Sequence, residues 1–502
     1  MWEHLSLLGM GLNNSLQPLN FLMILTGLTI GVLAGALPGI TMLNAIVLVL
    51  PFTYLMGIVP SILLMIGIYC GGVYAGSITG ILFNIPGDPM NVPTTWEGYK
   101  LNKKGFAAKA LGMAVICSAI GGFLSAMVMT LASPPFAKVA LSFSTCEYFA
   151  VILLGLTSVA VLGTRSVGSA LISLFCGMFL GTIGMEQIYG AMRFTFGIRF
   201  FETGIDFIVV LIGLFAIGEI LEQLSIKGKK ELVGSQKTRT QLPGIRDLWM
   251  IRNTILRSFG VGTTIGIIPG AGATVASFVC YGVEKQVSKE PEKFGTGVWE
   301  GLAASETANN ASTGGAMIPL LTLGIPGSGA TAVMLGAFLL HGVQPGPMLF
   351  TKSPDQVYTI FVGMLIANLL MILVGMGVAR FFAELMRVPE IILDAFIIIF
   401  CFLGAFALRN DITDVWLMTF FGILGFFMRR YGFAIPPMIL GIILGPLAEG
   451  YFMTTLIGAE NDFTVFFRRP VTICLIIVSI GLLLMPLLRK IGKKGKKVSE
   501  AR

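Results

Sequence analysis

Residues 305–327 read SETANNASTGGAMIPLLTLGIPG, in which one acid, two asparagines and five hydroxyl residues stand inside an otherwise apolar part of the chain. The run closes on Ile325, Pro326 and Gly327, and proline and glycine interrupt helices. An acid flanked by apolar segments is costly in a membrane and usually functional. We therefore expect a helix that breaks at Pro326, beside a polar site around Glu306.

The composition of the whole chain places this run in a membrane protein. Its 502 residues are 55% hydrophobic and 12% charged, about half the charged share of a soluble domain. With a mean hydropathy of +0.86, the chain can cover its core only if most of its exterior meets lipid. This excludes a soluble enzyme, a secreted disulfide scaffold, a disordered protein and, despite a net charge of +8, a nucleic-acid binder.

The sequence predicts no metal site or cofactor beyond a coupling Na⁺ or H⁺. Its seven cysteines lie in apolar stretches without CxxC spacing, and its two histidines, His4 and His341, are far apart. It also lacks an HExxH motif and a Walker A loop. We therefore do not expect an enzyme or an ATP-driven pump.

Apolar segments recur from residue 20 to residue 489, and we count about 11 to 15 of them. A full span takes about 20 apolar residues, and several segments are shorter or interrupted by glycine and proline. Such segments indicate half-helices or re-entrant hairpins. The predicted fold class is an all-α polytopic membrane protein with an inverted structural repeat of broken helices.

Lysine and arginine gather in three clusters, as is typical of cytoplasmic segments. They lie at 100–109, in a basic linker at 224–257 and in a basic tail at 489–502. The number of apolar segments before the first cluster is odd, and the numbers between successive clusters are even. All three clusters can therefore lie on the cytoplasmic side if the N-terminus is outside and the C-terminus inside. The linker then separates a first membrane half, 1–223, from a second, 258–488.

Each half contains two proline-glycine breaks in the same order, GALPG and NIPG at 35–39 and 84–87, then GIIPG and GIPG at 266–270 and 324–327. This order predicts one repeat at about 20–105 and another at about 258–350. By the charge argument, the segment before Pro38 enters from outside and the segment before Pro269 from inside. Inverted repeats with interrupted helices are a design of secondary transporters, whose site lies near the middle of the membrane. Ordinary kinked helices are the alternative.

The residues at these breaks suit two kinds of ligand. A helix N-terminus presents free N–H groups that favour a carboxylate, whereas carbonyl, hydroxyl and amide oxygens suit Na⁺. We expect the breaks themselves at Pro38, Gly39, Pro86, Pro269, Gly270 and Pro326. The expected substrate-binding residues are Thr41, Asn44, Ser77, Asn84, Gly87, Thr274, Gly327 and Ser328. The expected ion-coupling residues are Glu306, Asn309, Asn310 and Thr313.

Some of these residues have a second interpretation. Glu306 either binds a cation or carries a proton, or it lies at a loop edge with its carboxylate in water. Asn309 and Asn310 are either ligands or hydrogen-bond partners between helices. Asp88, in Gly-Asp-Pro, fits a turn residue better than a ligand.

Several long motifs carry a family resemblance: GALPGIT at 35–41, GIYCGGVYAGSI at 67–78, WEGY at 96–99, IPGAGAT at 268–274, ETANN at 306–310, IPLLTLGIPGS at 318–328 and HGVQPGP at 341–347. With these motifs the sequence resembles the large membrane subunit of the tripartite tricarboxylate transporters, the TctA family. The resemblance covers roughly residues 20–450, and the chain departs from the family pattern at Met42, Asp88 and Ser305.

The resemblance implies uptake of tricarboxylates or related carboxylate anions, driven by a Na⁺ or H⁺ gradient, in a bacterial inner membrane. It also implies two protein partners, a periplasmic or lipid-anchored solute-binding protein and a small four-helix membrane subunit. Alternatives are the same class of transporter with a non-carboxylate metabolite as cargo, or a channel or structural subunit. Membrane lipid is an expected partner; nucleic acid is not.

Overall fold

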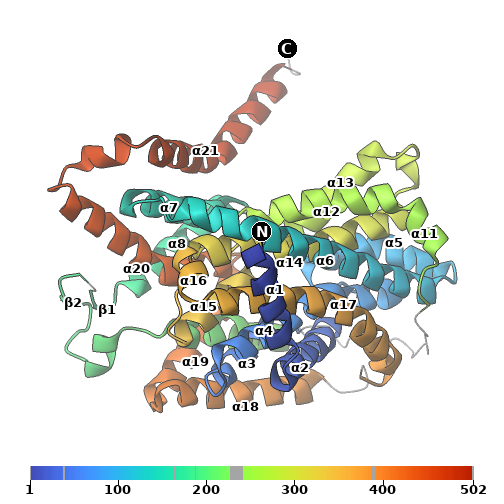
Figure 1. Ribbon diagram of the computed structural model, residues 1–502, viewed down its shortest axis with the longest axis horizontal. Helices are drawn as coiled ribbons and strands as arrows, with labels where there is room; N and C mark the ends of the chain where they lie inside the picture. Colours follow the sequence, from blue (N-terminus) through green and yellow to red (C-terminus); the bar gives the residue numbers. More distant parts are fainter. Residues whose placement is uncertain are drawn as a thin grey trace.

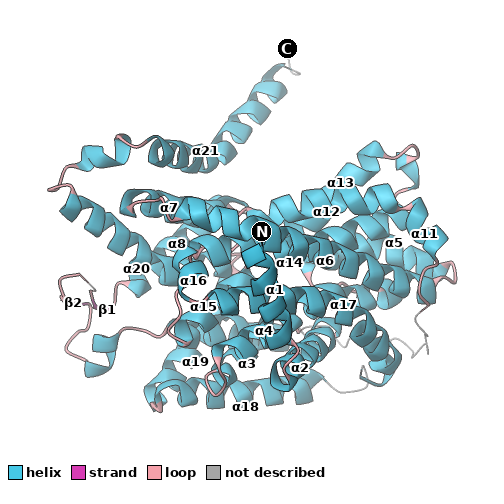
Figure 2. Ribbon diagram, in the orientation of Figure 1, coloured by secondary structure: helices cyan, strands magenta, loops and turns pink. Residues whose placement is uncertain are grey.

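The computed structural model describes residues 2–37, 40–162, 166–186, 188–225, 241–385 and 390–499, and these are almost entirely helical (Figure 2). The predicted all-α class is therefore confirmed. Among the described residues, seven helical stretches are long and apolar enough to cross a membrane. They are Pro18–Ala36, Ile58–Phe83, Ala107–Ala140, Phe207–Ser225, Pro354–Val378, Ile412–Arg430 and Ile435–Gly458.

The two predicted repeats contain matching series of helices. The first series is α2 (Pro18–Ala36), α3 (Met42–Thr53), α4 (Ile58–Phe83), the short 3-10 helix η1 (Pro89–Asn91) and α5 (Val92–Lys103). The second series is α12 (Arg252–Ile267), α13 (Gly272–Val287), α14 (Trp299–Leu323) and α15 (Gly329–Leu340), with the 3-10 helix η4 (Pro291–Lys293) before α14.

The remaining elements surround these two series. Those before the linker are α1 (Trp2–Ser15), α6 (Ala107–Ala140), α7 (Thr145–Leu162), α8 (Val167–Gly181), β1 (Gly184–Met185), β2 (Met192–Arg193), η2 (Arg199–Thr203), α9 (Phe207–Leu211), η3 (Ile212–Ile217) and α10 (Gly218–Ser225). Those after it are α11 (Ile245–Met250), α16 (Pro347–Lys352), α17 (Pro354–Leu385), α18 (Glu390–Arg409), α19 (Ile412–Arg430), α20 (Ile435–Gly458), η5 (Phe463–Phe467) and α21 (Pro470–Ser499). The strands β1 and β2 pair antiparallel.

The helices α4 and α14 form the centre of the molecule. Every residue from 61 to 81 in α4 and from 301 to 322 in α14 is buried. The helix α14 packs along α6, α12 and α13 and also touches α4 and α5, so helices from the two halves interlock. A helix that is buried on all sides needs partners for each of its polar groups, and α14 carries many such groups.

Close backbone contacts show how the helices of each series run. In the first, a Cβ on Gly31 or Gly35 would meet the carbonyl oxygen of Ile68 or Gly72, so α2 and α4 run parallel. In the second, α12 and α14 also run parallel, because Gly262 and Gly266 meet the carbonyl oxygens of Ala308 and Ser312 in the same way. Glycine is needed at these positions because any side chain would separate the backbones.

The two central helices run in opposite directions. Ser77 of α4 bonds to Glu306 of α14, whereas Cys70, earlier in α4, bonds to Asn310, later in α14. Two parallel pairs with antiparallel central helices support the predicted inverted repeat. The orientation of either series in a membrane remains a prediction.

The helices α4 and α14 also end in the same way. Asn84 and Gly324 both adopt a left-handed conformation, with φ of 62° and 71°, directly after the last helical turn. The following residues, Ile85 and Ile325, bond back to the carbonyl oxygens of Thr79 and Pro319. This left-handed cap turns the chain back on the helix and satisfies carbonyls that would otherwise lack partners.

The first basic cluster and the described part of the second lie at one end of the molecule. Lys109 forms an ion pair with Asp247 at 2.8 Å, and the backbone N–H of Gln241 bonds to the carbonyl oxygen of Ala108. In Figure 1 this end, with α5 and α11, lies opposite the end that carries β1 and β2. The arrangement agrees with a common side for both clusters.

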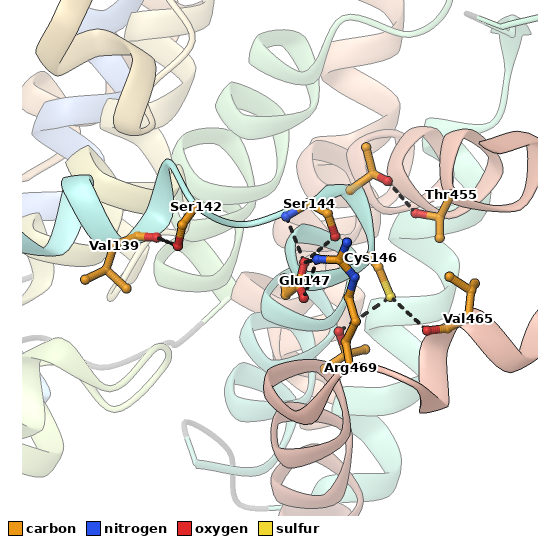
Figure 3. Close-up of polar contacts among 10 residues, drawn as sticks. Val139, Ser142, Ser144, Cys146, Glu147, Thr455, Val465 and Arg469 are labelled. Atoms are coloured by element: carbon orange, nitrogen blue, oxygen red, sulfur yellow. Dashed lines mark hydrogen bonds and ion pairs between the residues drawn. The ribbon is translucent and has the colours of Figure 1, made fainter. Parts of the chain in front are cut away.

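The start of α7 is fastened to the C-terminal helices (Figure 3). Glu147 accepts hydrogen bonds from the N–H of Ser144 and from Arg469, and Thr455 bonds to Thr145 at 2.8 Å. The thiol of Cys146 contacts the carbonyl oxygen of Val465 at 3.9 Å. These contacts attach α20, η5 and the start of α21 to the rest of the helices.

Parts of the sequence-based predictions fall on residues outside the described ranges. Pro38 and Gly39 of the first break are among them, and so are residues 226–240 of the linker and 500–502 of the tail. The division into domains at 223 and 258 stays a prediction.

We expect Gly266→Ala to destabilise the protein, because the new Cβ would lie 2.4 Å from the carbonyl oxygen of Ser312 on α14. Overpacking of this kind costs about 1–3 kcal/mol. The matched control is Gly260→Ala in the same helix, where a Cβ meets nothing within 4 Å. The measurement is the thermal unfolding midpoint in detergent. Equal midpoints for the two variants would contradict the close approach of α12 and α14.

Candidate functional site

The breaks of each series meet one another. In the first, a Cβ on Gly87 would lie 2.3 Å from the carbonyl oxygen of Gly35, and in the second a Cβ on Gly327 would lie 2.8 Å from that of Gly266. The N–H of Gly270 bonds to the carbonyl oxygen of Gly327 at 3.1 Å. The expected break residues therefore come together in pairs, as far as the described residues reach.

Contacts between the series bring these pairs together. The hydroxyl of Tyr69 on α4 lies 3.2 Å from the hydroxyl of Ser328, which precedes α15. A Cβ on Gly329, the first residue of α15, would lie 3.6 Å from a methyl carbon of Leu43, the second residue of α3. The N-termini of α3 and α15 are thus neighbours.

Both neighbouring N-termini are capped by the expected residues. Thr41 caps α3 by accepting a bond from the N–H of Asn44 at 3.2 Å, and Ser328 caps α15 by accepting one from the N–H of Thr331 at 3.3 Å. The amide oxygen of Asn44 is buried without a hydrogen-bond partner among the described residues. Helix N-termini carry partial positive charge, so this place favours an anion.

A carboxylate of the chain itself already lies at one of these N-termini. Asp88, only 6% exposed, accepts a bond of 3.4 Å from the N–H of Met42, the first residue of α3. Asp88 was expected to be a turn residue, and it does follow the break at Pro86 and Gly87. Its side chain, however, crosses to a different helix.

The expected ion-coupling residue Glu306 is fully buried in the middle of α14, which excludes a place at a loop edge. Its carboxylate accepts hydrogen bonds from Ser77 of α4 at 2.5 Å, from Thr94 of α5, and from Ser118 of α6 at 2.8 Å. Asn309 donates a longer bond of 3.4 Å. The donors for this carboxylate of the second series therefore come from α4 and α5 of the first series and from α6, the next helix along the chain.

Asn310 and Thr313 lie further along the same helix. The amide nitrogen of Asn310 donates to the carbonyl oxygen of Cys70 on α4 at 3.2 Å, and Thr313 donates to the carbonyl oxygen of Asn310. Asn310 thus does form a bond between helices. The amide oxygens of Asn309 and Asn310 are buried and have no partner in the part of the chain that the structure describes.

The remaining expected substrate-binding residues, Ser77, Thr274 and Asn84, lie at three different places. Ser77 was expected to bind substrate, and it lies with Glu306. Thr274 lies in the first turn of α13. Asn84 is exposed and forms the left-handed cap of α4.

Glu97 is a second fully buried carboxylate and was not among the predicted site residues. Its oxygens accept bonds from the hydroxyl of Tyr281 at 2.7 Å and from the N–H groups of Gly297 and Val298 at 2.7 and 2.9 Å. It thereby attaches α5 to α13 and to the start of α14. The signal available was an acid within WEGY, beside apolar segments. Ser118 carried no such signal, because it is a single hydroxyl in an apolar run.

The oxygens around Glu306 fit a monovalent cation or a proton better than a transition metal. Carboxylate, hydroxyl and amide oxygens are hard ligands. Among the described residues no group of three or more His, Cys, Asp or Glu side chains is placed to hold a metal ion.

Comparison with known proteins gives the chain a family. The model of the "Tripartite tricarboxylate transporter TctA family" matches residues 21–440. An Agrobacterium vitis protein described as an uncharacterised 52.8 kDa protein in the TAR-I ttuC' 3' region is 36% identical over 498 residues, which is 99% of each chain. A second protein of that organism, in the TAR-II ttuC' 3' region, is 37% identical over 47% of this chain and 98% of its own length. No solved structure matches the chain. With seven candidate spans and a family model that covers most of its length, the protein is a multi-pass membrane protein that belongs to the TctA family of tripartite tricarboxylate transporters.

Proposed function

We propose that this protein is the large membrane subunit of a binding-protein-dependent secondary transporter that imports carboxylate anions. The observation that carries the proposal is the adjacency of the N-termini of α3 and α15, where a Cβ on Gly329 would lie 3.6 Å from Leu43. Two helix N-termini at one place offer N–H groups and partial positive charge to an anion. Thr41, Asn44 and Ser328 are the side chains that contact the substrate there.

Glu306 and its hydroxyl partners form the ion-coupling site in this proposal. A buried carboxylate in a membrane protein is costly unless it is solvated by donors or neutralised by a cation. Moving one charge across a membrane is worth about 2.3 kcal/mol per 100 mV, so an entering anion needs accompanying cations. Na⁺ or H⁺ at Glu306 would supply such a charge, and Asn309, with its unpartnered amide oxygen, lies beside it.

The proposal also includes the partners and the location. A tripartite family implies partner subunits, and we assign them as a periplasmic or lipid-anchored solute-binding protein and a small four-helix membrane subunit. The basic end with α5 and α11 faces the cytoplasm of a bacterial cell, since lysine and arginine favour that side. The loop with β1 and β2 then faces outward.

The cargo has a second candidate. The carboxylate of Asp88 at the N-terminus of α3 favours a substrate with less negative charge than a tricarboxylate. This candidate keeps the transporter class and changes only the substrate.

Reconstitution in proteoliposomes tests the proposed function. With both partner subunits present, we expect labelled carboxylate to accumulate when an inward Na⁺ or H⁺ gradient is imposed, and not without one. We expect Glu306→Gln to abolish gradient-driven accumulation, because it removes the exchangeable charge while keeping the side chain's size. A normal elution profile on gel filtration would show that the variant is folded.

Two results would contradict this proposal. Accumulation that no gradient drives in the wild-type protein would reject secondary transport, and flux that does not saturate with substrate would indicate a channel. Normal coupled uptake by Glu306→Gln would remove Glu306 from the coupling site. Glu300→Gln is the matched control, because Glu300 is an exposed acid in the first turn of the same helix.

Thiol labelling tests the orientation. In a cysteine-free background, we expect Lys104→Cys to resist a membrane-impermeant reagent applied from outside the cell, and Tyr189→Cys to react. Both positions are exposed. Lys104 directly follows α5 and Tyr189 lies between β1 and β2, and Figure 1 shows these elements at opposite ends of the molecule. Reaction at position 104 but not at position 189 would reverse the proposed orientation.

A further inference from the structure

We propose that Asp88 is the residue that sets how much negative charge the substrate carries, and that it restricts the site to molecules with a single carboxylate. This inference rests on the proposed function, because it concerns the same helix N-termini. It adds a chemical class of substrate that family membership does not assign.

The internal repeat supplies a comparison within the chain. Asp88 and Ser328 occupy equivalent positions, each directly after an Ile-Pro-Gly break. Each also lies at the N-terminus of the helix that follows the first break of its own series. This helix is α3 for Asp88 and α13 for Ser328. Asp88 bonds to the N–H of Met42 at the start of α3, and a Cβ on Gly272, at the start of α13, would lie 3.6 Å from the Cβ of Ser328. The two equivalent places therefore differ by one carboxylate.

The two side chains are also used differently on their own helices. Ser328 caps α15 and forms reciprocal bonds with Thr331. Asp88 precedes η1 but forms no capping bond with it. Its carboxylate therefore bonds to α3 instead. A capping role in its own turn does not explain why an acid stands at this position.

Among the described residues, no positive side chain forms an ion pair with Asp88. It is 6% exposed and takes part in none of the ion pairs among the described residues. The first turns of α3, α13 and α15 contain no acid of their own. The helix N-terminus places partial positive charge beside its carboxylate.

The charge distribution has a direct consequence for recognition. In this inference the N-terminus of α15, which is capped by a neutral serine, accepts a carboxylate of the substrate. A second or third carboxylate directed toward α3 meets the like charge of Asp88 at short range, in a place with little water to screen it. A neutral hydroxyl or a cationic group of the substrate meets no such penalty. The site therefore selects monocarboxylates or zwitterions over di- and tricarboxylates.

Direct binding to the purified protein tests this inference. The probes are lactate, succinate and citrate, with one, two and three carboxylates, titrated at pH 7.5 and constant ionic strength. The readout is the shift of the thermal unfolding midpoint, from which apparent affinities are obtained. For the wild-type protein we expect lactate to bind more tightly than citrate.

We expect Asp88→Asn to reverse this order. Asparagine keeps an oxygen acceptor for the N–H of Met42 and removes only the charge. The affinity for citrate relative to lactate should rise at least about tenfold, which corresponds to ~1.4 kcal/mol. Asp88→Glu should keep the wild-type order, and Ser328→Asp should weaken citrate binding further. Glu300→Gln, an exposed acid outside the site, is the control for a general loss of negative charge.

The outcomes separate this inference from the proposed function. Unchanged relative affinities in Asp88→Asn, with wild-type binding intact, would overturn the selectivity role and leave the transporter proposal in place. Loss of all binding in Asp88→Asn, with a normal unfolding midpoint, would overturn it as well and make Asp88 an essential ligand. Absence of wild-type binding to every probe would reject the carboxylate site on which both proposals rest.

Discussion

A helix that ends inside a membrane protein leaves backbone N–H and C=O groups without water to satisfy them, and the centre of this molecule is organised by that constraint. The solution is to hydrogen-bond each break to a neighbouring backbone, either that of the preceding helix or that of the other break. Gly87 donates its N–H to the carbonyl oxygen of Gly76, and Gly270 donates to that of Gly327. Because these bonds require backbones in direct contact, glycine lies at the points of approach. In both series the second break also meets the helix that precedes the first break, since a Cβ on Gly87 or Gly327 would meet the carbonyl oxygen of Gly35 or Gly266.

The second constraint is the buried charge on α14. An acid in this position needs several donors, and its own helix supplies only Asn309. The others come from Ser77, Thr94 and Ser118 on three helices that precede the linker. One half of the chain thus solvates the charge of the other. A cation or proton that changes this charge would alter the contacts between the two halves, which is the physical basis for coupling in our proposal.

The two series share a backbone geometry but carry different side chains at equivalent positions. Asn84 and Gly324 form the same left-handed cap, although only one of them is glycine. Asp88 and Ser328 follow the same turn but present a carboxylate and a hydroxyl. Geometry is therefore common to both series, whereas charge is particular to each position. In our proposal, the residues beside the helix ends therefore set which substrate the site accepts, while the fold stays the same.

The sequence alone was enough to predict the all-α membrane class, the helix breaks and the polar run around Glu306. Those features depend on local properties: the length of apolar segments, the missing N–H of proline, the conformational freedom of glycine and the cost of an acid beside apolar segments. Burial and long-range contact were decided only by the tertiary structure. Ser118 becomes a partner of Glu306 because α6 packs along α14, and Glu97 becomes a buried anchor because the loop before α14 folds over it. Asp88 was taken for a turn residue because its neighbours are Gly87 and Pro89, and only packing places its carboxylate at the N-terminus of a helix that begins 46 residues earlier.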